Sequence, residues 1–495
     1  MSGTALHSQN EDLREIKKKS LAGVGSLALR QVGIKSIFFL GNVVLARILA
    51  PQIFGIYDIV TFIVLFFSSF GDVGLGAALI RKQGDLSREE LSTTFWLQQL
   101  MVFAVAGIAF VAAPLSLAVY PSLPQVSVWL IRVMAVSFIL MSLKTVPAIL
   151  MERNLDFNKI AWVDIAENLI YQAVAIMCAL AGFELWSFII AALVRGVAGV
   201  ALIYALSPWR PVFYYKFSLI SESMRFGLPY QLNKILSFVK DAVTPLFVGV
   251  YAGAAAVGYV NWARTLAFAP LIISASFERV AFPTFSKIRE DRSLLTRTIE
   301  RSIRNMTLLM FPITVLMIAL GPDIIRIVFT EKWKPGTGAF YFYCTSPMVI
   351  GILLPMYSAI LSLGKSAIML KMTVVLLCLE WGLGIPLVLQ YGFTGIAMNQ
   401  PLIASIFLVI YRIVLRSEDI TLNIVDNVKW QLGLAIITGI AVKFVSLNVL
   451  LTIATLPLVF LAGCALFAGL MYLLQRETTL EFKEYALSIV GRVGQ

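Results

Sequence analysis

The sequence is poor in the residues from which catalytic and metal sites are usually built. The 495 residues include one histidine, His7, so a histidine proton relay is excluded. The four cysteines, Cys178, Cys344, Cys378 and Cys464, all fall in apolar stretches without paired spacing, which predicts neither a disulfide nor a metal site. The sequence contains no nucleophile triad, metal-ligand cluster or phosphate-binding loop. These absences argue against an enzyme.

Apolar residues are abundant instead. They make up 59% of the chain, and the mean hydropathy is +0.86, which excludes a soluble protein. A window of roughly 19 residues finds about fourteen apolar stretches. Spans of about 20 residues each would use more than half of the chain and leave no soluble domain larger than a loop. We predict an all-α polytopic membrane protein with about fourteen transmembrane helices.

Lysine and arginine are distributed unevenly among the loops. The loops after even-numbered stretches are rich in lysine and arginine. The loops after odd-numbered stretches contain almost none, and the exception is the loop with Arg326, Lys332 and Lys334. The positive-inside rule then places both termini in the cytoplasm. Because the net charge of +12 lies mostly in these loops, we expect anionic membrane lipids as partners and no nucleic acid.

The predicted spans divide into two sets of six and a final pair. A short internal repeat supports this division, because Leu49–Tyr57 resembles Ala252–Tyr259 with Gly55 aligned on Gly258. Six spans return the chain to the same side, so the halves would be parallel, pseudo-symmetric lobes around a central cavity. The predicted parts are a cytoplasmic tail at 1–19, an N-terminal six-helix lobe at 20–207, an interfacial linker at 208–221, a C-terminal six-helix lobe at 222–416, helix pair 13–14 at 417–475, and a cytoplasmic tail at 476–495.

Polar residues inside the spans indicate where that cavity lies. A charge at the bilayer centre costs about 2.5–3.5 kcal/mol, so such residues usually face water or a partner. Lys35 and Asn42 share one face of the first span, and Lys234 and Asp241 repeat this spacing in the seventh. We predict that these faces line an aqueous chamber. The alternative is that Lys35 and Lys234 pair with carboxylates such as Asp164 or Glu167 and only hold the bundle together.

Several motifs resemble the polysaccharide transporters. These are the Wzx-type lipid-linked oligosaccharide flippases of the multidrug/oligosaccharidyl-lipid/polysaccharide (MOP) superfamily. The motifs are Phe70–Ile80 at the end of the second span, Gly258–Arg264 in the eighth, and Phe282–Lys287 in the loop that follows. Within the superfamily, lipid II flippases place cavity cations at the positions of Arg264, Lys35 and Gly41. Gly41 departs from this pattern, because it carries no charge. This difference argues against a flippase for the peptidoglycan precursor and for a related flippase that transports a different headgroup.

The resemblance implies a flippase in the bacterial inner (plasma) membrane. It would move an undecaprenyl-diphosphate-linked oligosaccharide across that membrane by alternating access, for surface or exopolysaccharide assembly. A polysaccharide polymerase and export proteins are its implied partners. We expect the diphosphate to contact basic residues of the cavity, and the sugars to contact polar and aromatic ones. The diphosphate candidates are Arg30, Lys35, Lys234 and Arg264, and the sugar candidates are Asn42, Gln172, Tyr230, Asn233 and Trp262.

The energy source is left open between three alternatives, and no cofactor or metal is expected. Proton or sodium coupling would use a carboxylate, with Asp72, Asp164, Glu167, Asp241 and Glu380 as the candidates. The membrane potential would act directly on a cationic cavity, at about 2.3 kcal/mol per charge per 100 mV. The alternative functions are a drug antiporter of the same superfamily and, less favoured, a membrane polysaccharide polymerase or ligase.

Overall fold

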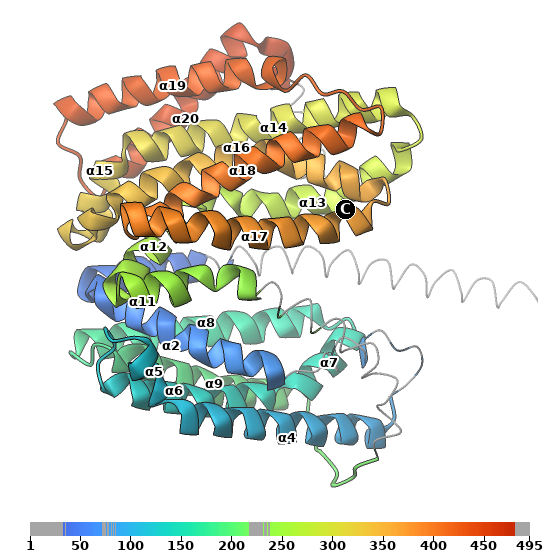
Figure 1. Ribbon diagram of the computed structural model, residues 1–495, viewed down its shortest axis with the longest axis vertical. Coiled ribbons are helices and arrows are strands. Elements are labelled where there is room, and N and C mark those ends of the chain that lie inside the picture. The colour runs from blue at the N-terminus through green and yellow to red at the C-terminus, as the bar shows by residue number, and fades with distance from the viewer. Residues whose placement is uncertain are drawn as a thin grey trace, which may run out of the picture. The chain divides into compact units, whose positions relative to one another are not determined.

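The computed structural model describes residues 33–34, 36–71, 76, 79–80, 82, 84, 86–216, 231, 235 and 238–480, and every regular element in them is helical. The chain forms two compact units that meet at Pro245 and Leu246. We call the part up to Pro245 unit 1 and the part that begins at Leu246 unit 2. Each unit is a bundle of long apolar helices (Figure 1).

Unit 1 is built on pairs of neighbouring helices. α8 packs along α9, α4 and α9 both pack on α6, and α2 packs on α4 and α6. Leu45, Tyr171 and Phe188 are among the residues of one buried cluster that joins the first helix to α8 and α9. The helices are Ser36–Ile48, α2 (Pro51–Gly71), α4 (Arg88–Ala112), α5 (Leu115–Val119), α6 (Val126–Ser142), α7 (Thr145–Arg153), α8 (Phe157–Leu180) and α9 (Trp186–Leu206).

Unit 2 is organised around α14 and α16, the two spanning helices that are more than half buried. α14 packs on α16 and α19, and α16 packs on α18. The long helices are α12 (Ala254–Ala267), α13 (Ser274–Ile288), α14 (Arg292–Ala319), α16 (Thr337–Ser362), α17 (Ser366–Tyr391), α18 (Thr394–Arg416), α19 (Ile424–Asn448) and α20 (Thr455–Leu474). The shorter ones are η2 (Thr244–Val248, across the unit boundary), α11 (Gly249–Tyr251), η3 (Ala269–Ile273), α15 (Gly321–Asp323), η4 (Ile324–Phe329) and η5 (Glu331–Gly336).

The helices confirm the all-α polytopic fold. Among the described residues, eleven helices are long and apolar enough to cross a membrane, and Ser36–Ile48 is a shorter apolar helix. The predicted first and seventh spans fall largely outside the described residues. The predicted eighth span is interrupted, because α12 ends at Ala267 and Pro270 lies in the 3₁₀ turn η3 before α13 begins. Proline lacks the N–H that a continuous α-helix would need there.

The aligned glycines of the internal repeat occupy matching helical positions. Gly55 lies four residues after the start of α2 and Gly258 four residues after the start of α12, and both are buried. The match extends the sequence similarity to the local structure. The parallel relation of two six-helix lobes stays a prediction.

The boundary between the units differs from the predicted linker. Phe238, which lies in the predicted seventh span, stacks on Phe62 of α2 with ring centroids 4.9 Å apart. The Gln231 side chain donates a hydrogen bond to the Ser69 carbonyl, also in α2. These contacts place the described part of this span in unit 1, so the contact boundary falls at Pro245. The lobe boundaries predicted from the sequence stay predictions.

Candidate functional site

Several candidate residues cannot be placed. Arg30, Lys35, Asp72, Tyr230, Asn233 and Lys234 all lie outside the described residues, so their proposed roles stay predictions. The remaining candidates lie within the two units, and each unit contains a cluster of polar residues around a buried glutamate.

The cluster of unit 1 is centred on Glu167 in α8, whose side chain is only 2% exposed. Glu167 Oε1 lies 2.5 Å from Lys144 Nζ, and Oε2 lies 3.5 Å from Arg195 Nε. Lys144 caps the start of α7, and Arg195 comes from α9, so three helices meet at one carboxylate. A buried carboxylate is tolerated when cations and hydrogen bonds surround it, and Glu167 has both.

Gly199 makes room for this ion-pair cluster. A Cβ atom at Gly199 would overlap Glu167 Oε1 and lie 3.0 Å from Lys144 Nζ. The absence of a side chain on α9 therefore lets the carboxylate reach Lys144. Lys144 is not among the site residues predicted from the sequence. The local signal that could have identified it is its position as a charged residue inside the long apolar stretch 126–153.

An aromatic pair continues the cluster towards α2. The Arg195 guanidinium carbon lies 5.9 Å from the Tyr171 ring centroid, within cation–π range. The Tyr171 hydroxyl donates a hydrogen bond to the Tyr57 hydroxyl at 3.0 Å, and the Tyr57 ring stacks on Phe188. Asp164, one turn before Glu167, is half-buried. The cluster thus links α2, α7, α8 and α9 through polar and aromatic contacts.

The structure gives a reason for the glycine at position 41, where the lipid II flippases place a cation. The Gln172 side chain, which is buried, fills the space that a Cβ atom at Gly41 would enter. Its Nε2 donates a hydrogen bond to the Phe38 carbonyl at 3.5 Å. Asn42, the neighbouring sugar-contact candidate, is half-buried. A large side chain at position 41 therefore fits only if Gln172 moves.

The cluster of unit 2 is centred on a buried glutamate that the sequence also offers as a coupling candidate. Glu380 in α17 is 7% exposed. Gln400 Nε2 donates a hydrogen bond to Glu380 Oε1 at 2.8 Å, and Asn399 Nδ2 donates to Oε2 at 3.2 Å. Both amides come from α18. Two neutral donors thus hold this carboxylate between α17 and α18.

Arg264 lies close to the same cluster. Its guanidinium carbon is 5.8 Å from the Phe268 ring centroid, and Phe268 packs edge-on against Tyr343 with centroids 5.8 Å apart. α12 packs on α16, and both α16 and α17 pack on α18. Residues of α12, α16, α17 and α18 therefore bring a cation, a phenol and a carboxylate into one region of unit 2.

Two other candidates have local partners that favour structural roles. Trp262 is buried, and its ring lies 5.2 Å from Trp333 and 5.3 Å from Phe329, centroid to centroid. This packing favours a core role over a platform for sugar rings. Asp241 is exposed and lies 2.9 Å from Lys240. Nothing in these contacts tests either residue as a transport residue.

Comparison with known proteins identifies the family of this sequence. Residues 44–337, more than half of the chain, match the polysaccharide biosynthesis protein family. The chain belongs to this family. Three relatives are the teichuronic acid biosynthesis protein TuaB of Bacillus subtilis (strain 168), the succinoglycan biosynthesis transport protein ExoT of Rhizobium meliloti (strain 1021) and the lipopolysaccharide biosynthesis protein WzxC of Escherichia coli (strain K12).

These family members are distant in sequence. TuaB is 24% identical over 53% of this chain, ExoT 26% over 56%, and WzxC 21% over 72%. The matched region spans about half the length of TuaB and ExoT, at 54% and 56%, and 73% of WzxC. The resemblance to polysaccharide transporters inferred from the motifs is confirmed at the level of the family.

Solved structures show which fold the family member adopts. The lipid II flippase MurJ in an inward closed conformation matches 92% of this chain and 99% of its own, with a TM-score of 0.73 and 14% identity. An inward-facing multidrug resistance MATE transporter of the MOP superfamily matches 79% of this chain and 98% of its own, with a TM-score of 0.57 and 14% identity. The chain is thus a multi-pass membrane protein with the fold of these transporters.

Proposed function

We propose that this protein is a flippase for a polyprenyl-diphosphate-linked oligosaccharide repeat unit and that it acts in surface or exopolysaccharide assembly. The observation that carries the proposal is the match to the polysaccharide biosynthesis family on a fold shared with MurJ. We place it in the inner membrane of a bacterium, because the three relatives above are bacterial proteins. We place its termini in the cytoplasm, because loops rich in Lys and Arg alternate with loops that have almost none. A polysaccharide polymerase and export proteins are its proposed partners.

The physical problem of such transport is the polar headgroup. An unpaired hydroxyl costs roughly 4–8 kcal/mol when it enters hydrocarbon, so an oligosaccharide cannot cross the bilayer unaided. A water-filled chamber removes most of that cost for the sugars while the polyprenyl tail stays in lipid. We propose that Lys35, Lys234 and Arg264 attract the diphosphate, with Arg264 making bidentate hydrogen bonds and the lysines acting as point charges.

Two buried carboxylates are the proposed coupling residues. Glu167 faces Lys144 and Arg195, so its charged form is stabilised by ion pairs. Glu380 is held by amide donors of α18. We propose that proton or sodium coupling uses one of these two carboxylates.

The test is made in cells deleted for the gene. Loss of surface polysaccharide, with polyprenyl-diphosphate oligosaccharide accumulating on the cytoplasmic leaflet, is the expected result. Wild type should restore export, whereas Arg264→Ala should not, although it reaches the membrane in equal amount. Lys159→Ala is the control, since its exposed ion pair with Asp156 has no proposed role in transport. Normal glycolipid turnover with intact surface polymer would instead favour the small-molecule antiporter.

A further inference from the structure

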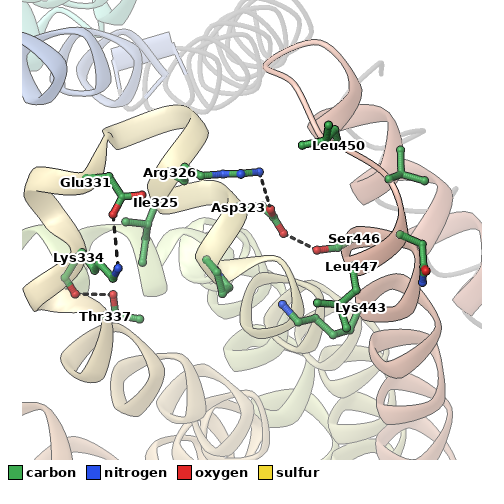
Figure 2. A pocket seen from close by; sticks show the side chains of 13 residues that line it. Asp323, Ile325, Arg326, Glu331, Lys334, Thr337, Lys443, Ser446, Leu447 and Leu450 are labelled. Carbon is green, nitrogen blue, oxygen red and sulfur yellow. Dashed lines mark hydrogen bonds and ion pairs between the residues drawn. The ribbon is translucent and has the colours of Figure 1, made fainter.

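Unit 2 contains a pocket of about 600 Å³ at the end of the bundle opposite its basic loops (Figure 2). One wall is the segment between α14 and α16, which includes Asp323, Arg326 and Lys334. The other wall is the end of α19 and the turn towards α20. The volume lies within the range of about 300–1,000 Å³ that is usual for small-molecule sites. Arg326 and Lys334 also belong to the loop that is the exception to the charge alternation of the sequence.

Most charges of the pocket already have partners. Asp323 Oδ1 lies 3.3 Å from an Arg326 guanidinium nitrogen, and the Ser446 hydroxyl donates a hydrogen bond to Oδ2. Glu331 lies 3.7 Å from Lys334 Nζ. Both carboxylates are thus engaged, and Figure 2 shows these pairs on the pocket wall. The pocket is lined by three cations, Arg326, Lys334 and Lys443, and by two carboxylates, Asp323 and Glu331. Its net charge is therefore +1.

Lys443 carries that remaining charge. Within the part of the chain that the structure describes, it has no ion pair, and it is half-buried in the pocket wall. It lies five residues before the end of the spanning helix α19, which is roughly 8 Å along the helix axis. A lysine at such depth is costly unless it reaches a polar space or a counter-charge. The pocket supplies the space, and an anionic ligand would supply the charge.

The rim of the pocket is apolar and exposed. Leu447 is 73% exposed and Leu450 is 85% exposed, and both line the pocket beside Lys443. Ile453, three residues after Leu450 in the turn between α19 and α20, is also exposed. Leucine and isoleucine side chains at the end of a membrane helix can pack against lipid acyl chains. The opening of the pocket therefore combines a positive charge with an apolar surface.

We propose that this pocket binds the phosphate of an anionic lipid headgroup, with Lys443 as its principal contact and the leucines of the α19–α20 turn against the acyl chains. Lys334, whose side chain is 77% exposed, adds a second positive charge at the edge. Arg326 offers a planar guanidinium beside it, which suits phosphate oxygens. This site is separate from the basic loops, which attract lipid from the other membrane face.

The experiment counts lipids bound to the purified full-length protein by native mass spectrometry, with phosphatidylglycerol, phosphatidylcholine and soluble glycerol phosphate as probes. Wild type should retain phosphatidylglycerol over phosphatidylcholine, and glycerol phosphate should bind much more weakly. Lys443→Gln should weaken phosphatidylglycerol retention roughly fivefold, the effect of one lysine near an anionic surface. Lys443→Arg, which keeps the charge, should retain it.

Lys429→Gln is the matched control, because Lys429 lies at the opposite end of the same helix and is paired with Asp426 at 2.6 Å. An equal loss in Lys429→Gln and Lys443→Gln would show that only total charge matters and would overturn the proposal. Equal binding of glycerol phosphate and phosphatidylglycerol would overturn the assignment to a lipid. If Lys443→Gln does not fold, Lys334→Gln decides the question, since unchanged retention in that exposed variant would contradict the site.

Discussion

At the scale of single residues, Glu167 shows how a membrane bundle accommodates a carboxylate. Its two oxygens face Lys144 and Arg195, which come from elements on either side of it in the chain. The charge of Glu167 therefore joins three helices, in addition to any part it plays in transport. The same argument applies to Gly199, since any side chain there would displace the carboxylate.

Replacing Glu167 by alanine should destabilise unit 1 strongly. Removing one member of a buried ion pair leaves an uncompensated charge and typically costs about 3–5 kcal/mol. Thermal unfolding of the purified protein in detergent should show a clearly lowered midpoint. Asp156→Ala is the control, because that carboxylate pairs with Lys159 on an exposed surface and should contribute at most about 1 kcal/mol. Equal shifts for both variants would contradict a structural role for Glu167.

Gly41 and Gln172 should behave as a coupled pair. Gly41→Ala alone should overpack the contact between the first helix and α8, at a cost of about 1–3 kcal/mol, because the new methyl group meets the Gln172 amide. Gln172→Ala should remove that conflict. The measurement is the thermal midpoint of the two single variants and the double variant. Strict additivity would argue that Gln172 does not fill the space at position 41.

The charged partners show the limit of what a sequence alone predicts. The spacing of Lys35 and Asn42 indicates a polar helix face, because helical periodicity is a local property. The pairing of Glu167 with Lys144 depends on where α7 and α8 cross, and no local pattern encodes that crossing. The sequence therefore predicted that Glu167 needs a water-facing or charged environment, but it did not identify Lys144 and Arg195 as the cations that supply it. The alternative pairing of Lys35 and Lys234 with carboxylates stays a prediction, because both lysines lie outside the described residues.

At the scale of elements, hydropathy predicted the positions of most spans, and a side-chain cap determines where α4 begins. Hydropathy alone begins the third span near Thr93, whereas α4 begins at Arg88. Ser87 accounts for the difference, because its hydroxyl accepts a hydrogen bond from the Glu90 backbone N–H at 3.1 Å. Glu90 also pairs with Lys82 at 2.8 Å. A polar first turn is invisible to a hydropathy window but is stabilised by its cap.

Removal of this cap should loosen the start of α4. Ser87→Ala should cost about 1 kcal/mol, the usual contribution of a serine N-cap. Amide hydrogen exchange of the first turn of α4 should rise in the variant. Ser68→Ala serves as the control, because the Ser68 hydroxyl donates a hydrogen bond to the Leu65 carbonyl inside α2 and does not cap a helix. Unchanged exchange in Ser87→Ala would mean that the ion pair between Lys82 and Glu90 holds the helix start by itself.

At the scale of the whole molecule, the orientation in the membrane is the prediction with the widest consequences. We expect Asn448 and Asn427, near opposite ends of α19, to face opposite sides of the membrane. In a variant without the four native cysteines, Asn448→Cys should react with a membrane-impermeant maleimide in intact cells. Asn427→Cys should react only after permeabilisation. The reverse pattern would place the basic loops outside the cell and contradict the proposed direction of transport.

The ion-pair cluster of unit 1 also has a consequence for how the protein is made. α8, which carries Glu167, is the least apolar of the eleven spanning helices in the described residues. Lys144 lies 23 residues before Glu167, and Arg195 lies 28 residues after it. During synthesis, the insertion machinery therefore receives the first cation before the carboxylate and the second one after it. Glu167 can be neutralised as soon as α8 enters the bilayer, and α9 then completes the cluster.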